Sequence, residues 1–342
     1  MNNKWDNEDL ESDILLLKNL KDKVNKKDKA IVLDDIYKLS EFLDDKVKIE
    51  KVEYIIQNMM ILDKYKYILK ELGRFNTLFQ ERDISHLFLP LSDSYYSDND
   101  VLCFINDFYK SLGNDIYDNF SINFRKKDYN FKFIDGSFNN RYGLFAGFTI
   151  AINYLKKNYI EVENANSVQK IMYATHEYAH ATAREITSYK KINDEISEVE
   201  SLFMELLAID YYKNLLGKND FDKYAYNNLN SMLNSANYVI RVNNAYKTIN
   251  KMIKSNTNID EIKNFDIFKD MDSYVIADII YPHCYLLAVE LYEEYKIDPE
   301  KALYKYKKII NNNVLYSKIF IKPNDNITNY GDEVIKLVKK LD

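Results

Sequence analysis

Two histidines and a glutamate near the middle of the chain have the spacing of a catalytic zinc site. Residues 176–180 read His-Glu-Tyr-Ala-His, which is the pattern H-E-x-x-H. On a helix, His176 and His180 lie one turn apart on the same face, so both imidazoles can reach one zinc ion while Glu177 faces water bound to that ion. The metal lowers the pKa of this water, and the carboxylate accepts its proton as the water attacks a carbonyl. The alternative is a structural histidine pair with an incidental glutamate.

The residues around this motif predict the helix that the geometry needs. Apolar side chains recur at helical spacing from Val168 to Ala183, and Asn166 followed by Gln169 is an N-cap signal about two turns before His176. Glu177 is the only charged residue between Lys170 and Arg184, as expected for a buried ligand face.

A catalytic zinc ion takes three protein ligands and keeps one position open. The metzincin pattern is excluded, because Ala183 and Ile186 stand where its glycine and its third histidine would be. A glutamate on a following helix is the other common solution. Residues 193–207 predict such a helix, and Glu198 lies within its apolar stripe. A carboxylate on an inner face needs a partner, and a metal ion can be that partner.

The other acidic residues of this second helix divide between its two sides. Ser201 and Glu205 follow Glu198 at spacings of three and seven, on the same inner side. Glu195 and Glu200 are expected on the solvated side, where most carboxylates lie.

At this point the chain resembles the thimet oligopeptidase and oligoendopeptidase F family of zinc peptidases, which are gluzincins. The family carries E-x-x-S-x-x-x-E on its second helix, and Glu198, Ser201 and Glu205 match that pattern. The resemblance implies that Glu198 is the third zinc ligand and that Glu205 orients a ligand histidine. It covers roughly residues 128 to 310. The family's usual glycine is Ala179 here, and the family's chains are longer, which implies a shortened N-terminal helical part.

Two further segments fit the resemblance. Residues 130–136 and 144–153 are the best strand candidates, at the place of the family's small sheet, whose edge strand holds extended peptide before the zinc helix. Downstream, Tyr285 matches the tyrosine-bearing segment whose hydroxyls stabilise the oxyanion, with His283 and Tyr281 as neighbours that could share this role. Pro282 suits the first turn of that helix. The glycine-rich turn and the histidine that the family has before its tyrosines are absent.

Composition predicts a mainly α protein. The 342 residues include only seven glycines and four prolines, so turns are scarce and helices long. The expected architecture is a multi-helix zinc peptidase fold with a small β-sheet before the H-E-x-x-H helix and a substrate cleft between helical halves. We expect an N-terminal helical region over residues 1–128 and the catalytic domain over residues 129–342. His86 is expected to be structural, because three ligands are already available.

Charge and hydropathy limit the classes of partner that this protein can have. A net charge of −6 with both signs interspersed argues against nucleic acid, and no apolar run approaches the length of a membrane span. The N-terminus has no signal-peptide core, and two isolated cysteines give no disulfide framework, so a cytoplasmic location is expected. The oligomeric state is not predicted.

The sequence therefore predicts a zinc-dependent endopeptidase that cleaves oligopeptides with one Zn²⁺. The predicted metal ligands are His176, His180 and Glu198, and the predicted catalytic residues are Glu177, Tyr285 and His283. One alternative is a degenerate, non-catalytic peptidase-like helical binding module. Another is an exported toxin or effector protease with a protein target, which would have the same sequence features.

Overall fold

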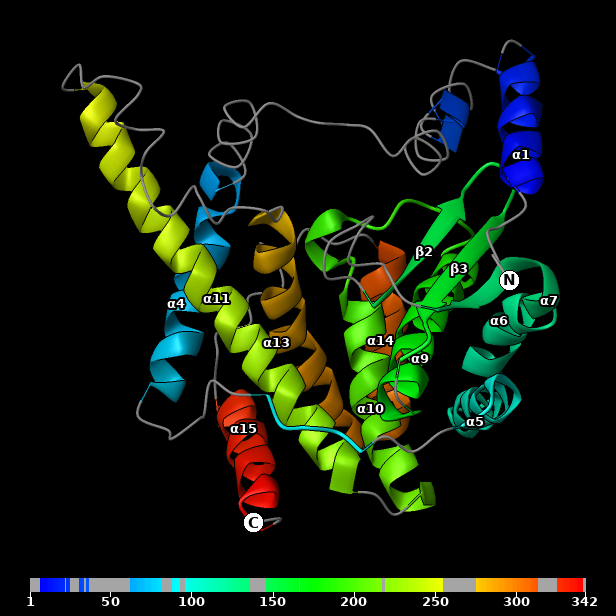
Figure 1. Cartoon of the computed structure of the whole chain (residues 1–342). Coiled ribbons are helices and arrows are strands. Elements are labelled where there is room, and N and C mark those ends of the chain that lie inside the picture. Colours follow the sequence, from blue (N-terminus) through cyan, green and yellow to red (C-terminus); the bar gives the residue numbers. More distant parts are fainter. Residues whose placement is uncertain are drawn as a thin grey trace. The chain divides into compact units, whose positions relative to one another are not determined.

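A computed structural model of the chain consists mainly of helices, with one small sheet that precedes the helix of the H-E-x-x-H motif (Figure 1). This agrees with the fold class that the sequence predicts. The structure describes residues 7–21, 23–24, 31–33, 35–36, 62–80, 88–92, 96–135, 146–165, 167–216, 219–254, 275–312 and 325–340. The chain divides into two compact units, Met1–Lys48 with Asp93–Ile192 and Ile49–Ser92 with Asn193–Asp342.

The sheet lies in the first unit and has the strand order β1-β3-β2. Its strands are β1 (Phe131–Ile134), β2 (Gly147–Ile152) and β3 (Lys157–Glu163), with β1 parallel and β2 antiparallel to β3. The predicted strands at 130–136 and 144–153 are confirmed with narrower bounds. The central strand β3 is missing from the sequence prediction, because its Asn158 and Glu161 look solvated. Both side chains are buried, and Asn158 donates to Asn123 and to Tyr189 at 3.0 and 2.8 Å.

Helix α9 (Ser167–Ile186) packs against β2 and β3, and helices of the same unit pack against α9 in turn. These are α5 (Asp98–Ser111), α6 (Asn114–Phe124) and α7 (Lys127–Asn130), of which α5 and α6 contact α9. Aromatic rings fill the contact: Tyr178 stacks on Phe131 and meets Phe120 edge-on, and Phe120 stacks on Tyr109. The Tyr109 hydroxyl donates to the carbonyl of Thr175 at 3.0 Å, one residue before the motif.

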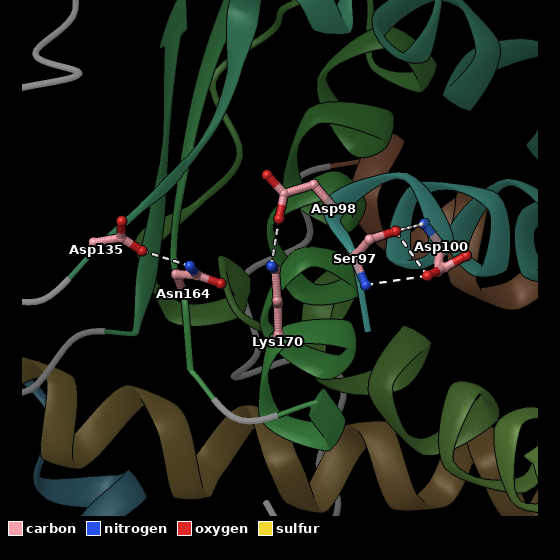
Figure 2. Close-up of polar contacts among 6 residues, drawn as sticks. All are labelled: Ser97, Asp98, Asp100, Asp135, Asn164 and Lys170. Carbon is pink, nitrogen blue, oxygen red and sulfur yellow. Dashed lines mark hydrogen bonds and ion pairs between the residues drawn. The ribbon is translucent and has the colours of Figure 1, made fainter. Parts of the chain in front are cut away.

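Polar contacts also tie α9 to its surroundings (Figure 2). Lys170 is buried, and its Nζ lies 2.5 Å from Asp98 Oδ1 and 4.3 Å from the centre of the Phe133 ring. Asp98 is the first residue of α5, whose start is held by a capping box between Ser97 and Asp100. A buried lysine needs such partners, because its charge would otherwise be costly to remove from water.

The beginning of the chain packs against the β2–β3 hairpin. Helix α1 (Asn7–Leu20) contributes Ile14 and Leu17 to an apolar cluster with Ile152 and Tyr159. Asp13 accepts hydrogen bonds from Lys157 and from the Tyr159 hydroxyl. The apolar residues at helical spacing from Leu10 to Leu20 belong to α1, whereas those from Val52 to Leu62 lie almost wholly outside the described residues.

The regular secondary structure described in the second unit is all helical, and α13 contacts most of the other helices of this unit (Figure 1). Its elements are α4 (Lys66–Phe79), the short 3₁₀ helix η1 (Asp194–Ile196), α10 (Val199–Leu216), α11 (Asn219–Lys254), α13 (Val275–Ile297), α14 (Pro299–Asn312) and α15 (Asp325–Val338). Pro282 is inside α13 and not in its first turn, because the helix begins at Val275. The predicted domain boundary near residue 128 stays a prediction.

Candidate metal centre

His176 and His180 lie one turn apart on α9, as the sequence predicts, and their rings converge. The two Nε2 atoms are 3.2 Å apart, the ring centres 4.9 Å apart, and both side chains are half-buried. Two nitrogens bound at zinc distances in a tetrahedral arrangement lie about 3.3 Å apart. The pair therefore already has the separation that one zinc ion requires.

The helix presents these rings because its other faces are occupied. Val168, Ile171, Met172, Ala179 and Ala183, the predicted apolar stripe, are all buried. The small side chains of Ala179 and Ala183 let α9 approach its neighbours closely, so the motif is held on a rigid element. The predicted N-cap, Asn166, lies outside the described residues.

Glu177 is buried and contacts strand β2. Thr149 Oγ1 lies 2.8 Å from Glu177 Oε2 and 2.9 Å from the Glu177 carbonyl oxygen. Gly147, two residues earlier on the same face of the strand, leaves room for the carboxylate. Thr149 was not predicted as a site residue, because a threonine in a strand carries no local signal of a contact with a helix that begins 18 residues later.

Glu198 lies in the turn before α10, not inside a helix as predicted. Its carbonyl accepts the Leu202 amide at 3.0 Å, which makes it the N-cap residue, and Ser201 Oγ lies 3.2 Å from Glu198 Oε2. His176, His180 and Glu198 each offer one ligand atom, and these atoms lie within 4.8 Å of one another. This group could hold a metal ion.

The donor set of this group fits zinc. Two imidazole nitrogens with one carboxylate oxygen are a known catalytic zinc set, which leaves a fourth position open. Mg²⁺ and Ca²⁺ prefer all-oxygen sites, so two converging imidazoles argue against them.

The expectation that Glu195 and Glu200 face solvent is wrong. Glu195 is 7% and Glu200 0% exposed. Residues 199–209 of α10 are all buried, so this part of the helix has no solvated face to which Glu200 could be assigned. Glu195 forms a side-chain hydrogen bond with Tyr67, which together with burial raises the pKa of that tyrosine.

Glu205 is buried, as its predicted inner position requires, and two side chains of α11 hold it. The Tyr224 hydroxyl and Asn228 Nδ2 donate to Glu205 Oε2 at 3.2 and 3.1 Å. Its suggested role in orienting a ligand histidine stays a prediction.

The predicted catalytic segment on α13 is more buried than a substrate-contacting group requires. Tyr285 and His283 are both 0% exposed, whereas Tyr281 is half-buried. Tyr285 meets the Tyr330 ring edge-on at 6.2 Å, and burial raises the pKa of its hydroxyl. His283 Nδ1 lies 3.6 Å from Glu71 Oε2 on α4; burial lowers the pKa of His283 to about 3 and raises that of Glu71 to about 7. The catalytic roles of Tyr285 and His283 stay predictions, and His86 lies outside the described residues.

The chain has the fold of known peptidases. PZ peptidase A with an inhibitor matches at a TM-score of 0.52 and 12% sequence identity, over 85% of this chain and 59% of that chain. A candidate oligoendopeptidase F from Bacillus anthracis str. Ames matches at 0.52 and 14%, over 93% and 63% of the two chains. A candidate peptidase from Chlamydophila abortus matches at 0.53 and 11%, over 87% and 56%. The resemblance to the oligoendopeptidase F family is thus confirmed at the level of the fold.

This chain covers roughly three fifths of the length of those proteins, with 59%, 63% and 56% of them matched. No protein-family model matches the sequence, and no curated protein matches it either. Within the described residues, no helix combines the length and the apolar character that crossing a bilayer requires.

Proposed function

We propose that this protein is a zinc-dependent endopeptidase that hydrolyses peptide bonds in oligopeptides. The observation that carries the proposal is that one ring nitrogen each of His176 and His180 and one Glu198 oxygen lie within 4.8 Å of one another, with the buried Glu177 next to His176 in the chain. The peptidase fold supports the same conclusion.

In this proposal His176, His180 and Glu198 hold one zinc ion. A bound zinc ion lowers the pKa of water and polarises a carbonyl, which is the chemistry that peptide hydrolysis needs at neutral pH. Ser201 Oγ, 3.2 Å from Glu198 Oε2, keeps the carboxylate of this ligand oriented.

Glu177 is the general base. Its carboxylate takes the proton of the attacking water and passes it to the amine of the leaving peptide. Burial and the contact with Thr149 restrict this carboxylate to one conformation, so it loses little conformational entropy on reaching the transition state.

The side chain that stabilises the oxyanion comes from the α13 segment. A residue in this role has to touch the substrate. Of the three predicted candidates, Tyr281 is half-buried, whereas Tyr285 and His283 have no exposed surface. We therefore place Tyr281 first and keep Tyr285 and His283 as alternatives that require α13 to shift.

Replacing Glu177 by Gln tests the proposal. The variant should bind zinc as the wild type does and lose about 10²–10⁴-fold in kcat, because the proton acceptor is gone. Cleavage of a quenched-fluorescence peptide library, with metal content measured by atomic spectroscopy, gives both values. The exposed Glu300→Gln is the matched control and should keep full activity.

The outcomes separate the candidate functions. Wild-type activity that a chelator abolishes and zinc restores supports the peptidase. Zinc binding without cleavage of any peptide would identify the non-catalytic binding module, and full activity of Glu177→Gln would overturn the assignment of the base. Cleavage restricted to a folded protein would favour an effector-like protease with a protein target.

A further inference from the structure

We infer that Thr149, on strand β2, is a positioning residue for the general base Glu177. This inference rests on the proposed peptidase function. It assigns to the strand a part in catalysis other than contact with the substrate.

The contact is made at two points of the same glutamate. Thr149 Oγ1 is 2.8 Å from Glu177 Oε2 and 2.9 Å from the Glu177 carbonyl oxygen. The hydroxyl has a single hydrogen, which these two acceptors share, so the hydrogen bond fixes the carboxylate relative to the backbone of its own residue. A glutamate has three side-chain torsions, and a hydroxyl that contacts both its carboxylate and its carbonyl oxygen restricts all three.

The second carboxylate oxygen of Glu177 lies close to Gly147. A Cβ atom at position 147 would lie 2.9 Å from Glu177 Cγ, 3.0 Å from Glu177 Oε1 and 2.9 Å from the Glu161 carbonyl oxygen. Residues 147 and 149 face the same side of β2, because side chains alternate along a strand. One oxygen is therefore hydrogen-bonded by Thr149, and the other passes over a position where a side chain would collide.

The strand that carries both residues is itself fixed. Gly147 pairs with Val162 and Thr149 with Ile160 on the central strand β3, and both partners are fully buried. Because α9 packs on β2 and β3, the distance between strand and motif cannot drift without loss of core contacts. A base held by a rigid element needs less reorganisation during the reaction.

A purely structural role is the competing explanation, since any buried carboxylate needs a hydrogen-bond donor. Kinetics distinguish the two. Thr149→Val keeps the shape and the strand propensity but removes the hydroxyl. In the zinc-loaded enzyme it should lower kcat by about ten- to hundred-fold, with KM changed less than about two-fold, because a hydrogen bond to a charged group is lost only at the base. Thr149→Ser restores the hydroxyl and should recover most of kcat.

Thr187→Val is the matched control. Thr187 is also a buried threonine that follows the motif, but its hydroxyl bonds only the carbonyls of Ala183 and Arg184. This control should leave kcat within about two-fold of the wild type. Gly147→Ala should lower kcat like Thr149→Val, because the new methyl group displaces the carboxylate.

A stability cycle tests the contact without any turnover. Thr149→Val should lower the Tm of the zinc-loaded protein by about 2–4 °C more in the wild-type background than in the Glu177→Met background. The inference would be overturned if Thr149→Val lowered the Tm equally in both backgrounds. It would also be overturned if the two side chains were coupled in stability but Thr149→Val left kcat unchanged. A wild-type protein that cleaves no peptide overturns the proposed function and the positioning role with it, while the cycle still reports whether the two side chains interact.

Discussion

Burial sets the protonation of a polar pair at the side of α13. Glu71 and His283 lie 3.6 Å apart and are 2% and 0% exposed. Desolvation disfavours the charged form of each, which raises the pKa of Glu71 to about 7 from 4.5 and lowers that of His283 to about 3 from 6.5. Between about pH 3 and pH 7 the two groups are therefore mainly an uncharged acid beside a neutral imidazole, and not an ion pair.

Because the pKa of Glu71 is raised, the effect of Glu71→Gln on stability should depend on pH. Between pH 4.5 and about 7 the unfolded chain ionises Glu71 while the folded chain keeps it protonated, so the wild type loses stability as pH rises through this window. The variant lacks this loss. Its Tm relative to the wild type should rise from pH 4.5 to pH 7.5, by an amount that corresponds to at most about 3 kcal/mol.

Comparing Glu71→Gln with the wild type at each pH removes the opposite contribution of His283 to the pH dependence of stability. His283, whose pKa is lowered, costs stability as pH falls from 6.5 towards 3, and it is present in both proteins. A difference between Glu71→Gln and wild type that stays constant over the range would contradict the prediction. Thermal unfolding followed by circular dichroism at each pH is sufficient.

Helix α15 approaches α4 through a glycine. A Cβ atom at Gly331 would lie 2.3 and 2.4 Å from two ring carbons of Phe79, which is itself buried and packs edge-on against Phe75. No other residue type fits without moving this ring. Gly73, in the middle of α4, has nothing within 4 Å of the same position. The two glycines thus differ in space but not in secondary structure.

Alanine substitutions of these two glycines should have opposite signs. Gly73→Ala should stabilise the protein by about 0.5–1 kcal/mol, because alanine loses less backbone entropy in a helix. Gly331→Ala should destabilise it by about 1–3 kcal/mol, since an added methyl group overpacks the contact. Urea denaturation measures both. Stabilisation by both variants would show that α15 and α4 separate easily.

Over the whole molecule, the candidate ligands lie far enough apart in sequence for metal binding to depend on folding. His176 is on α9 and Glu198 is in the turn before α10, 22 residues later, so the unfolded chain has no preformed site.

Zinc should therefore stabilise the folded protein. Added to chelator-treated protein at about a hundredfold excess over its Kd, it should contribute about 2.7 kcal/mol and raise Tm by several degrees. The shift should be much smaller for Glu198→Ala and unchanged for Glu300→Ala, and Mg²⁺ should not reproduce it. An equal shift for Glu198→Ala would remove Glu198 from the ligand set.

The sequence alone determined what depends on neighbours within a few turns or residues. The H-E-x-x-H spacing requires a helix, and the apolar stripe from Val168 to Ala183 provides one. Scarcity of glycine and proline predicted a mainly helical chain. Local patterns were sufficient for β1 and β2 and for the helix of the H-E-x-x-H motif, because the periodicity of apolar residues is visible among residues close in the sequence.

Only the tertiary structure decided what depends on contacts between distant segments. Strand β3 is buried on both sides, so its polar residues are satisfied by remote partners and its sequence does not alternate as that of a half-exposed strand does. Glu195 and Glu200 were misassigned for the same reason, since η1 and the first three turns of α10 bury both side chains. Thr149 on the strand contacts Glu177 on the helix, 28 residues further along the chain, and only tertiary packing brings the two together.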